Sequence, residues 1–398
     1  MHIATANAYN TALDQLMTRQ NNLANSQEQL TSGKRVNRAS DDPAAAARAE
    51  RALAAEARST ANQRAVDASD NAMTLTESAL GDAGELLQQI REKLVQAGNT
   101  SLTDADRKSI AGEVSEMRKQ LFSIANRTDG AGTFLFGGQS ADQAPFVDAV
   151  GGVQFTGQAG SQQAASGEPL PLTVDGETAW MRAGSGNGVF ATRAITSTGS
   201  GWIGSGSVTN PQALTGGTYT VQFSIAAGAT TYTVLQNGNP TVPPQNNVAF
   251  TPGQAVQVDG MSATINGSPA NGDVFGIAPS TPVSVFGAVD RAIADLNTPN
   301  RRGTQNAQSA STNLATIDSV MGQLQSSRSQ VGATLNRVDG VTGRLSALKL
   351  ASQTERSNAE SLDMTQAISD FGNQQTGYDA ALKTYSLVQK LSLFNYLG

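Results

Sequence analysis

Acidic pairs are the residues of this 398-residue chain whose types and spacing could do chemistry. Asp41 and Asp42 are adjacent, and Asp67 and Asp70 are three residues apart. Paired carboxylates can perform general acid–base catalysis or hold a hard cation. Asp42, however, comes directly before Pro43 and an alanine-rich run, which is where a helix N-cap belongs. We therefore interpret the first pair as a helix cap.

No residue in the chain completes a catalytic or metal-binding set around these carboxylates. The single histidine is His2, and a residue so near a chain end is normally frayed. There is no cysteine, which excludes disulfides, thiolate nucleophiles and cysteine-ligated zinc. Serines and threonines are abundant, but no base is placed to activate them. We expect no catalytic, cofactor-binding or metal-binding residues, and hence not an enzyme.

Charge and hydropathy exclude two further classes of partner. The chain has 27 Lys+Arg against 33 Asp+Glu, a formal net charge of -6, so it lacks the dense basic face of a nucleic-acid binder. No apolar stretch approaches the ~18 residues that span a bilayer, and the first residues lack the features of a secretory signal.

The glycine-rich run Gly184–Gly188 lacks the strand and helix context of a phosphate-binding loop.

Both flanks of the chain show the seven-residue spacing of packed helices. Near the N-terminal side, one row is bulky and its companion is small: Val66, Met73, Leu80, Leu87 and Leu94 beside Ser69, Thr76, Ala83, Ile90 and Ala97. Near the C-terminal side, the corresponding apolar row is Ile317, Leu324, Val331, Val338 and Leu345. Gly98 ends the first helix, and Thr103 with Asp106 resembles a capping box that starts the next one.

The middle of the chain has a different character. Only nine charged residues lie between Ala141 and Val285. Tyr219, Val221, Phe223 and Ile225 alternate with polar residues, and turn residues punctuate the rest, as in β structure. The fold class is therefore α+β and multi-domain, a helical coiled-coil stem that folds back on itself and carries an inserted all-β domain.

We expect three regions from these changes in pattern. Residues 1–40 with 365–398 form a terminal coiled-coil region. Residues 41–140 with 285–364 form a helical stem domain with a short β element near 132–137. Residues 141–284 form the inserted β domain.

Four segments carry a resemblance to the bacterial flagellin superfamily. The stretch Leu30–Ala44, LTSGKRVNRASDDPA, resembles the flagellin N-terminal signature. The segments Thr76–Leu80 (TESAL) and Gln89–Glu92 (QIRE), and the stretch Arg328–Arg337 (RSQVGATLNR), are similar to further motifs of the two terminal regions. The chain's start, its end and Pro269–Phe275 are more similar to hook-associated proteins than to filament flagellins. His2 and Ala45 depart from the usual residues without breaking the pattern.

The resemblance implies a structural protein at the hook–filament junction of the bacterial flagellum, needed for motility and exported to the cell exterior without a cleaved signal peptide. It implies four partners: hook-associated protein 1 (FlgK), flagellin, copies of the same chain in the junction ring, and an export chaperone (FlgN) before secretion. It implies no nucleic acid, no membrane insertion and no cofactor. A minor or atypical flagellin is the first alternative. An adhesive or carbohydrate-binding β module on a helical stem is the second, which exposed, clustered Trp180 and Trp202 would favour.

The two chain ends carry the expected partner-binding residues. Their apolar rows are incomplete or unusually aromatic, and short isolated helices are marginal in water, so these ends need a partner surface. The predicted residues are Leu13, Leu16, Leu23, Leu30, Phe371, Tyr378, Leu382, Tyr385, Leu391 and Phe394. An ordinary seam between the C-terminal helix and residues 9–30 is the other interpretation of the same rows.

Overall fold

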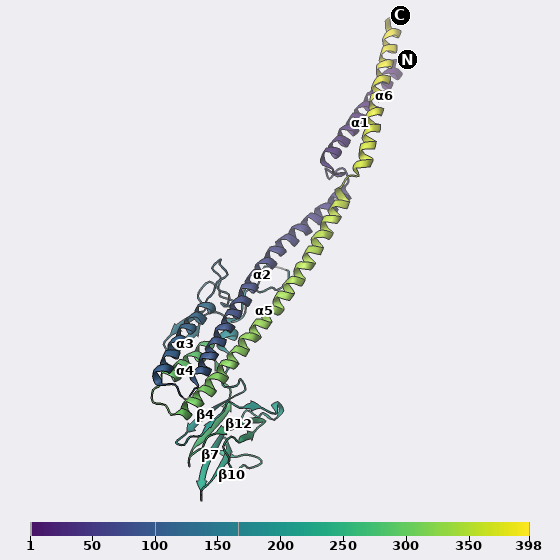
Figure 1. Ribbon diagram of the computed structural model, residues 1–398. Coiled ribbons are helices and arrows are strands. Elements are labelled where there is room, and N and C mark those ends of the chain that lie inside the picture. Colours follow the sequence, from purple (N-terminus) through teal and green to yellow (C-terminus); the bar gives the residue numbers. More distant parts are fainter. Residues whose placement is uncertain (1, 100, 166, 398) are drawn as a thin grey trace. The chain divides into compact units, whose positions relative to one another are not determined.

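The computed structural model describes residues 2–99, 101–165 and 167–397, with the side chains of all of these except 2–6, 8 and 388–397. The chain divides into two compact units, Met1–Arg64 with Val341–Gly398, and Ala65–Gly340. The first unit contains the first and last helices of the chain, and the second unit contains the described strands (Figure 1). In the described part of the chain, no helix combines the length and apolarity that crossing a bilayer requires.

In the first unit, the first and last helices lie side by side. They are α1 (His2–Ser32) and α6 (Met364–Leu397), and they run antiparallel because Tyr9 lies against Tyr385 while Ser26 bonds to Gln374. The expected folding back of the chain is therefore confirmed in this unit (Figure 1).

The second unit contains four helical segments, and their boundaries follow local sequence signals. They are α2 (Pro43–Ala97), α3 (Asp104–Ala125), α4 (Val285–Asn297) and α5 (Gly303–Glu360), of which α2 and α5 also contribute to the first unit. The capping box is present, since Thr103 Oγ1 accepts from Asp106 N and Asp106 Oδ2 accepts from Thr103 N. Ser284 caps α4 through Gly287 N.

Most of the heptad residues lie in the first hydrophobic core, as predicted, while Leu345 at the end of the second row is half-buried. Val66, Met73, Leu80, Leu87 and Leu94 are at most 3% exposed, and Ile317, Leu324, Val331 and Val338 of α5 are equally buried. At 25 cal/mol per Å² of apolar surface, each such side chain stabilises the fold by about 1.5–3 kcal/mol.

The segment after α3 adds an aromatic cluster to this same core. The Trp180 ring stacks on Phe286 of α4 at 5.7 Å and meets Phe136 and Phe146 edge-on. The hairpin of β1 (Phe146–Ala149) and β2 (Gly152–Phe155) lies here, as does the short π-helix Glu177–Met181. The expected boundary at residue 141 therefore falls inside the first core, because bulky apolar residues beyond it pack on the helices.

Isolated backbone bridges occupy the stretch between α3 and β1. Phe134 bridges to Thr128, and Gly137 bridges to Asp175. The region near 132–137, where we expected a short β element, has bridges and turns in place of a regular strand.

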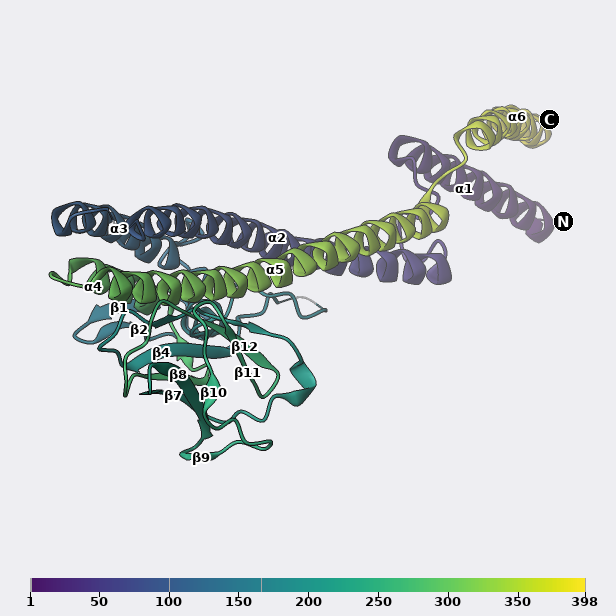
Figure 2. The same ribbon diagram turned by 60° about the horizontal axis from the view of Figure 1, so that its bottom comes forward.

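The β domain holds a second, separate core between two antiparallel sheets (Figure 2). The six-stranded sheet has the order β10-β8-β7-β13-β4, with β9 paired to β8, and the four-stranded sheet has the order β11-β12-β5, with β6 paired to β12. The strands of the first are β4 (Phe190–Thr196), β7 (Tyr219–Ala226), β8 (Ala229–Gln236), β9 (Asn239–Pro240), β10 (Val248–Ala249) and β13 (Val274–Pro279). Those of the second are β5 (Trp202–Ile203), β6 (Ser207–Val208), β11 (Ala255–Val258) and β12 (Met261–Asn266).

Alternation along the strands separates this core from solvent. Tyr219, Val221 and Phe223 of β7 are buried and Gln222 is exposed, as the period of two predicts, but Ile225, expected in the buried row, is 41% exposed near the end of the strand. The Ala227–Gly228 turn closes the β7–β8 hairpin with positive φ at both residues.

Candidate subunit interface

The stretch Leu30–Ala44 forms a clamp in the first unit, which holds the α1–α2 connection against the α5–α6 connection. Gly33 ends α1 with a φ of 68°. Arg35 N donates to Glu360 O at 2.6 Å, and Leu362 N donates to Gly33 O at 3.1 Å. Lys34 pairs with the Glu360 carboxylate at 2.8 Å. These bonds join two connections that are more than 300 residues apart in the chain.

The acidic pair stabilises the same clamp. Asp42 Oδ1 accepts from Ala45 N at 2.9 Å, and its other oxygen pairs with Arg35 at 3.1 Å. The Ala45 N–H and then the Arg35 guanidinium hold the pKa of Asp42 below its usual value. Asp41 Oδ2 accepts from the backbone of Asn37 and Arg38. All the bonds that these two carboxylates make are structural, so the interpretation of Asp42 as a cap is confirmed.

The predicted leucine row of α1 faces α6. Leu16 is 9% exposed, and Leu13, Leu23 and Leu30 are half-buried. Phe371, Tyr378 and Tyr385 of α6 are half-buried in turn. The hydrogen bond from Ser26 Oγ to Gln374 Oε1 is 2.8 Å long, and the Tyr9 and Tyr385 rings are 5.7 Å apart. The structure therefore brings both rows together within one chain.

Two of the predicted residues lie beyond the described side chains. Leu391 and Phe394 belong to the last turns of α6, of which only the backbone is described.

Pairing with α1 leaves a neighbouring row of α6 in solvent. Met364 is 45% exposed, Ile368 is 60% exposed and Leu382 is 41% exposed. At 100° per residue these three positions fall within a 40° sector of the helix, beside Phe371 and Tyr378. We call Met364, Ile368 and Leu382 the outer row. Of these three, only Leu382 was among the partner-binding residues predicted from the sequence, although the spacing of Met364 and Ile368 marks the same face.

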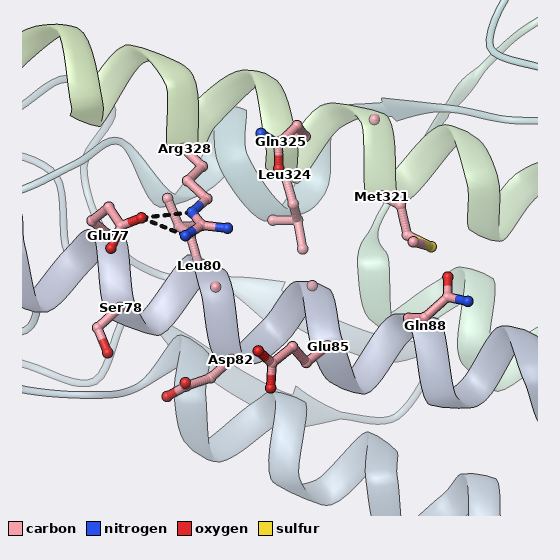
Figure 3. Close-up of a pocket in the computed structure, with 13 residues that line it drawn as sticks. Glu77, Ser78, Leu80, Asp82, Glu85, Gln88, Met321, Leu324, Gln325 and Arg328 are labelled. Carbon is pink, nitrogen blue, oxygen red and sulfur yellow. Dashed lines mark hydrogen bonds and ion pairs between the residues drawn. The ribbon is translucent and has the colours of Figure 1, made fainter.

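A groove of about 610 Å³ lies between α2 and α5 at the surface of the second unit (Figure 3). Its floor is open because Gly84 and Gly322 have no other atom within 4 Å of the Cβ position. Arg328 of α5 closes one end by pairing with Glu77 of α2 at 2.6 Å. Glu85 is exposed on the rim.

The tryptophans are not arranged as a carbohydrate-binding surface. Trp180 is fully buried in the first core, and Trp202 lies in the four-stranded sheet of the β domain. The feature that would favour the adhesive alternative is therefore missing from the described residues.

The arrangement of terminal helices around an inserted domain is that of a flagellin-type subunit. The chain matches the bacterial flagellin N-terminal helical region over residues 3–141 and the C-terminal helical region over residues 314–397. Flagellins of several bacteria are similar over shorter parts of the chain.

Similarity to hook-associated protein 3 is more extensive. The protein of that name from Escherichia coli is 26% identical over 374 residues, which are 92% of this chain and 90% of that protein. That from Salmonella typhimurium is 37% identical over 145 residues, 36% of this chain, so the matched part spans about half of that relative (46%). The crystal structure of the flagellar junction protein FlgL from Legionella pneumophila is 32% identical, with a TM-score of 0.65, covering 70% of this chain and 95% of that one.

The chain belongs to the flagellar hook-associated protein 3 family, the FlgL junction proteins of the flagellin superfamily.

Proposed function

We propose that this chain is the structural subunit that joins the flagellar hook to the filament outside the cell, after export without a cleaved signal peptide. The outer row of α6 carries the proposal. Three large apolar side chains in one row, 41–60% exposed on a helix already paired with α1, are a surface that a further protein covers.

The proposed partners are those of a junction. Hook-associated protein 1 (FlgK) would contact the subunit on the hook side and flagellin on the filament side, while further copies of the chain complete the ring. Continuous helices suit this role, because an amphipathic helix can pack its apolar face equally well on a neighbouring helix of a similar subunit.

The same α6 surface would be held by the export chaperone (FlgN) before secretion. A soluble monomer with an exposed apolar row risks self-association, and a chaperone that covers the row prevents it. Leu391 and Phe394 are proposed to extend this surface.

The three regions expected from the sequence divide this work. The terminal region 1–40 with 365–398 would make the contacts between subunits, and the stem, whose core continues beyond residue 141 to Trp180, would carry the β domain.

A deletion strain tests the proposal. Cells that lack the gene should build hooks, secrete flagellin into the medium and form no filaments, and the wild-type gene should restore filaments. If the chain were a minor flagellin, the deletion strain would still carry filaments, of altered length or composition. Normal filaments on the deletion strain would contradict the junction role.

A further inference from the structure

The second unit contains two hydrophobic cores that share no described residue. The first lies among α2 to α5 and includes Trp180 and Phe286. The second lies between the two sheets and includes Phe190, Ile203 and Phe275. Because apolar burial is the main source of cooperativity in a fold, each core can remain closed while the boundary between them opens.

The chain crosses this boundary twice, through a neck of small residues. There β3 (Ala183–Gly184) pairs with β14 (Pro282–Val283). The glycine run directly after β3 permits close backbone packing. A Cβ on Gly186, whose φ is 63°, would lie 2.3 Å from Phe190 O, and a Cβ on Gly184 would lie 2.8 Å from Gly188 O. The glycine run thus forms a compact neck.

Hydrogen bonds to polar side chains of α5 hold the β domain beside the neck. Gly186 N donates to Thr316 Oγ1 at 3.3 Å, Ile203 N to Gln308 Oε1 at 2.9 Å, and Ser205 N to Ser311 Oγ at 3.2 Å. Arg302 adds a fourth bond, from Nη1 to Thr198 O at 2.8 Å. In the first three cases the acceptor is a side chain of α5, whereas Arg302 directly precedes that helix.

Water can replace such bonds when the boundary opens, so their net contribution is small compared with that of either core. We propose that the β domain is a hinged arm, with residues 184–188 and 279–283 as the hinge and with Gln308, Ser311 and Thr316 of α5 as a latch. The arm has a docked state, in which the three backbone N–H groups bond to the latch, and an open state in which both cores stay intact. The arm can thus change its angle to the stem helices without unfolding.

Hydrogen exchange of the full chain, followed by mass spectrometry, tests the latch. In the wild type, peptides that cover Gly186 and 203–205 should exchange faster than those of β7 and β13. In the latch variant Gln308→Ala, Ser311→Ala, Thr316→Val they should exchange about tenfold faster still, with β7 and β13 unchanged. A matched control makes the same three kinds of change further along α5, Gln330→Ala, Ser329→Ala and Thr334→Val. There, Thr334 bonds to its own helix as Thr316 does, and the other two side chains are exposed.

If the peptides that cover Gly186 and 203–205 exchanged at the same rate as β7 in the wild type, the proposal would be overturned, because the arm would then open only by unfolding. Equal acceleration of all these peptides in the latch variant would overturn it too.

A distance measurement supplies an independent reading. The chain has no cysteine, so Gln222→Cys on β7 and Ser326→Cys on α5, both at exposed positions, can carry the only two spin labels. We expect a second, longer distance population when the latch substitutions are added. A distance distribution that the latch substitutions leave unchanged would show that the neck alone fixes the arm, contrary to the proposal.

Discussion

Glu77 and Arg328 are 251 residues apart in the chain, and Glu77 Oε1 accepts from both Nε and Nη2 of Arg328, at 2.7 and 2.6 Å. Each residue belongs to one of the flagellin-like motifs, and the pair fixes the register between α2 and α5 at the end of the groove (Figure 3). Arg91 and Asp318 form a second such pair at 2.6 Å.

The first prediction concerns this register contact. In a double-mutant cycle of Glu77→Ala and Arg328→Ala, the coupling should be about 0.5–1 kcal/mol, because both side chains remain one-third or more exposed. The cycle is measured by urea unfolding. The Arg91 and Asp318 cycle is the comparison, and it should give no larger a value because Asp318 is half exposed. Additive effects of the two single substitutions at Glu77 and Arg328 would contradict the expectation.

Helices were predictable from the sequence because a seven-residue repeat places every member of a row on one face, and burial of Leu87 or Ile317 follows directly. The contact of Glu77 with Arg328 was not, since the repeat of each helix leaves the register between them open. Low charge predicted a non-helical middle region, but it could not assign Phe146 and Trp180 to the first core, because composition does not say which surface an apolar residue meets. For the same reason, the sequence predicted the aromatic row of α6, but it did not predict which side of that row packs on α1.

A second prediction uses the acid sensitivity of the β domain. Asp273 is fully buried and accepts from Thr198, Gly199 and Ala270. Burial alone would raise its pKa, but these hydrogen bonds outweigh burial and lower it. The stabilisation is therefore present above the unfolded pKa of about 3.9 and is lost as the pH falls through the folded value.

Asp273→Asn should consequently lower the free energy of unfolding by about 1–3 kcal/mol at pH 7. The difference from wild type should shrink as the pH falls below about 4, because the unfolded wild-type chain takes up a proton there first, and the stabilisation is lost once the pH is below the lowered pKa of folded Asp273. Urea titrations between pH 7 and pH 3, followed by tryptophan fluorescence, measure both. A difference that stays constant over this range would mean that the charge of Asp273 does not matter.

A third prediction separates the β domain from the stem at the core boundary. Replacing residues 190–279 with a short Gly/Ser linker should leave the helices folded, because the neck strands β3 and β14 and the first core are retained. Replacing residues 142–284 should greatly destabilise the helices, since it removes Trp180 and also Asp148, which pairs with Arg118.

Thermal unfolding by circular dichroism distinguishes the two deletions, and filament growth measures their function. The shorter deletion should retain export and some filament growth. Loss of all filaments despite normal secretion of the shorter variant would place the β domain in the junction itself.

A fourth prediction concerns the free monomer. Residues 1–40 and 365–398 should be cut rapidly by protease in dilute solution and protected after assembly, because α1 packs mainly on α6 and the outer row is open to solvent. Limited proteolysis of monomer and of isolated flagella, with the cut sites mapped by mass spectrometry, makes the comparison. Equal protection in both states would count against a terminal region completed by neighbours.

The last prediction separates the partner surface of α6 from its seam with α1. Ile368→Ser with Leu382→Ser removes two apolar side chains of the outer row that are 60% and 41% exposed, so the helix content of the monomer should change little. Chaperone binding and junction assembly should both fall at least tenfold, because two large apolar contacts of about 1.5 kcal/mol each are lost.

Tyr378→Ser with Tyr385→Ser tests the face of α6 that packs on α1, where the Tyr385 ring meets Tyr9. Tyr9→Ser is the matched control, because it alters the same contact from α1. If the half-buried tyrosines serve only the intramolecular seam, this double variant and Tyr9→Ser should loosen α1 alike in proteolysis. If they also face partners, the double variant should lose binding that Tyr9→Ser keeps. Wild-type chaperone binding and junction frequency in the outer-row variant would exclude that row as the partner surface, whatever the tyrosine variants show.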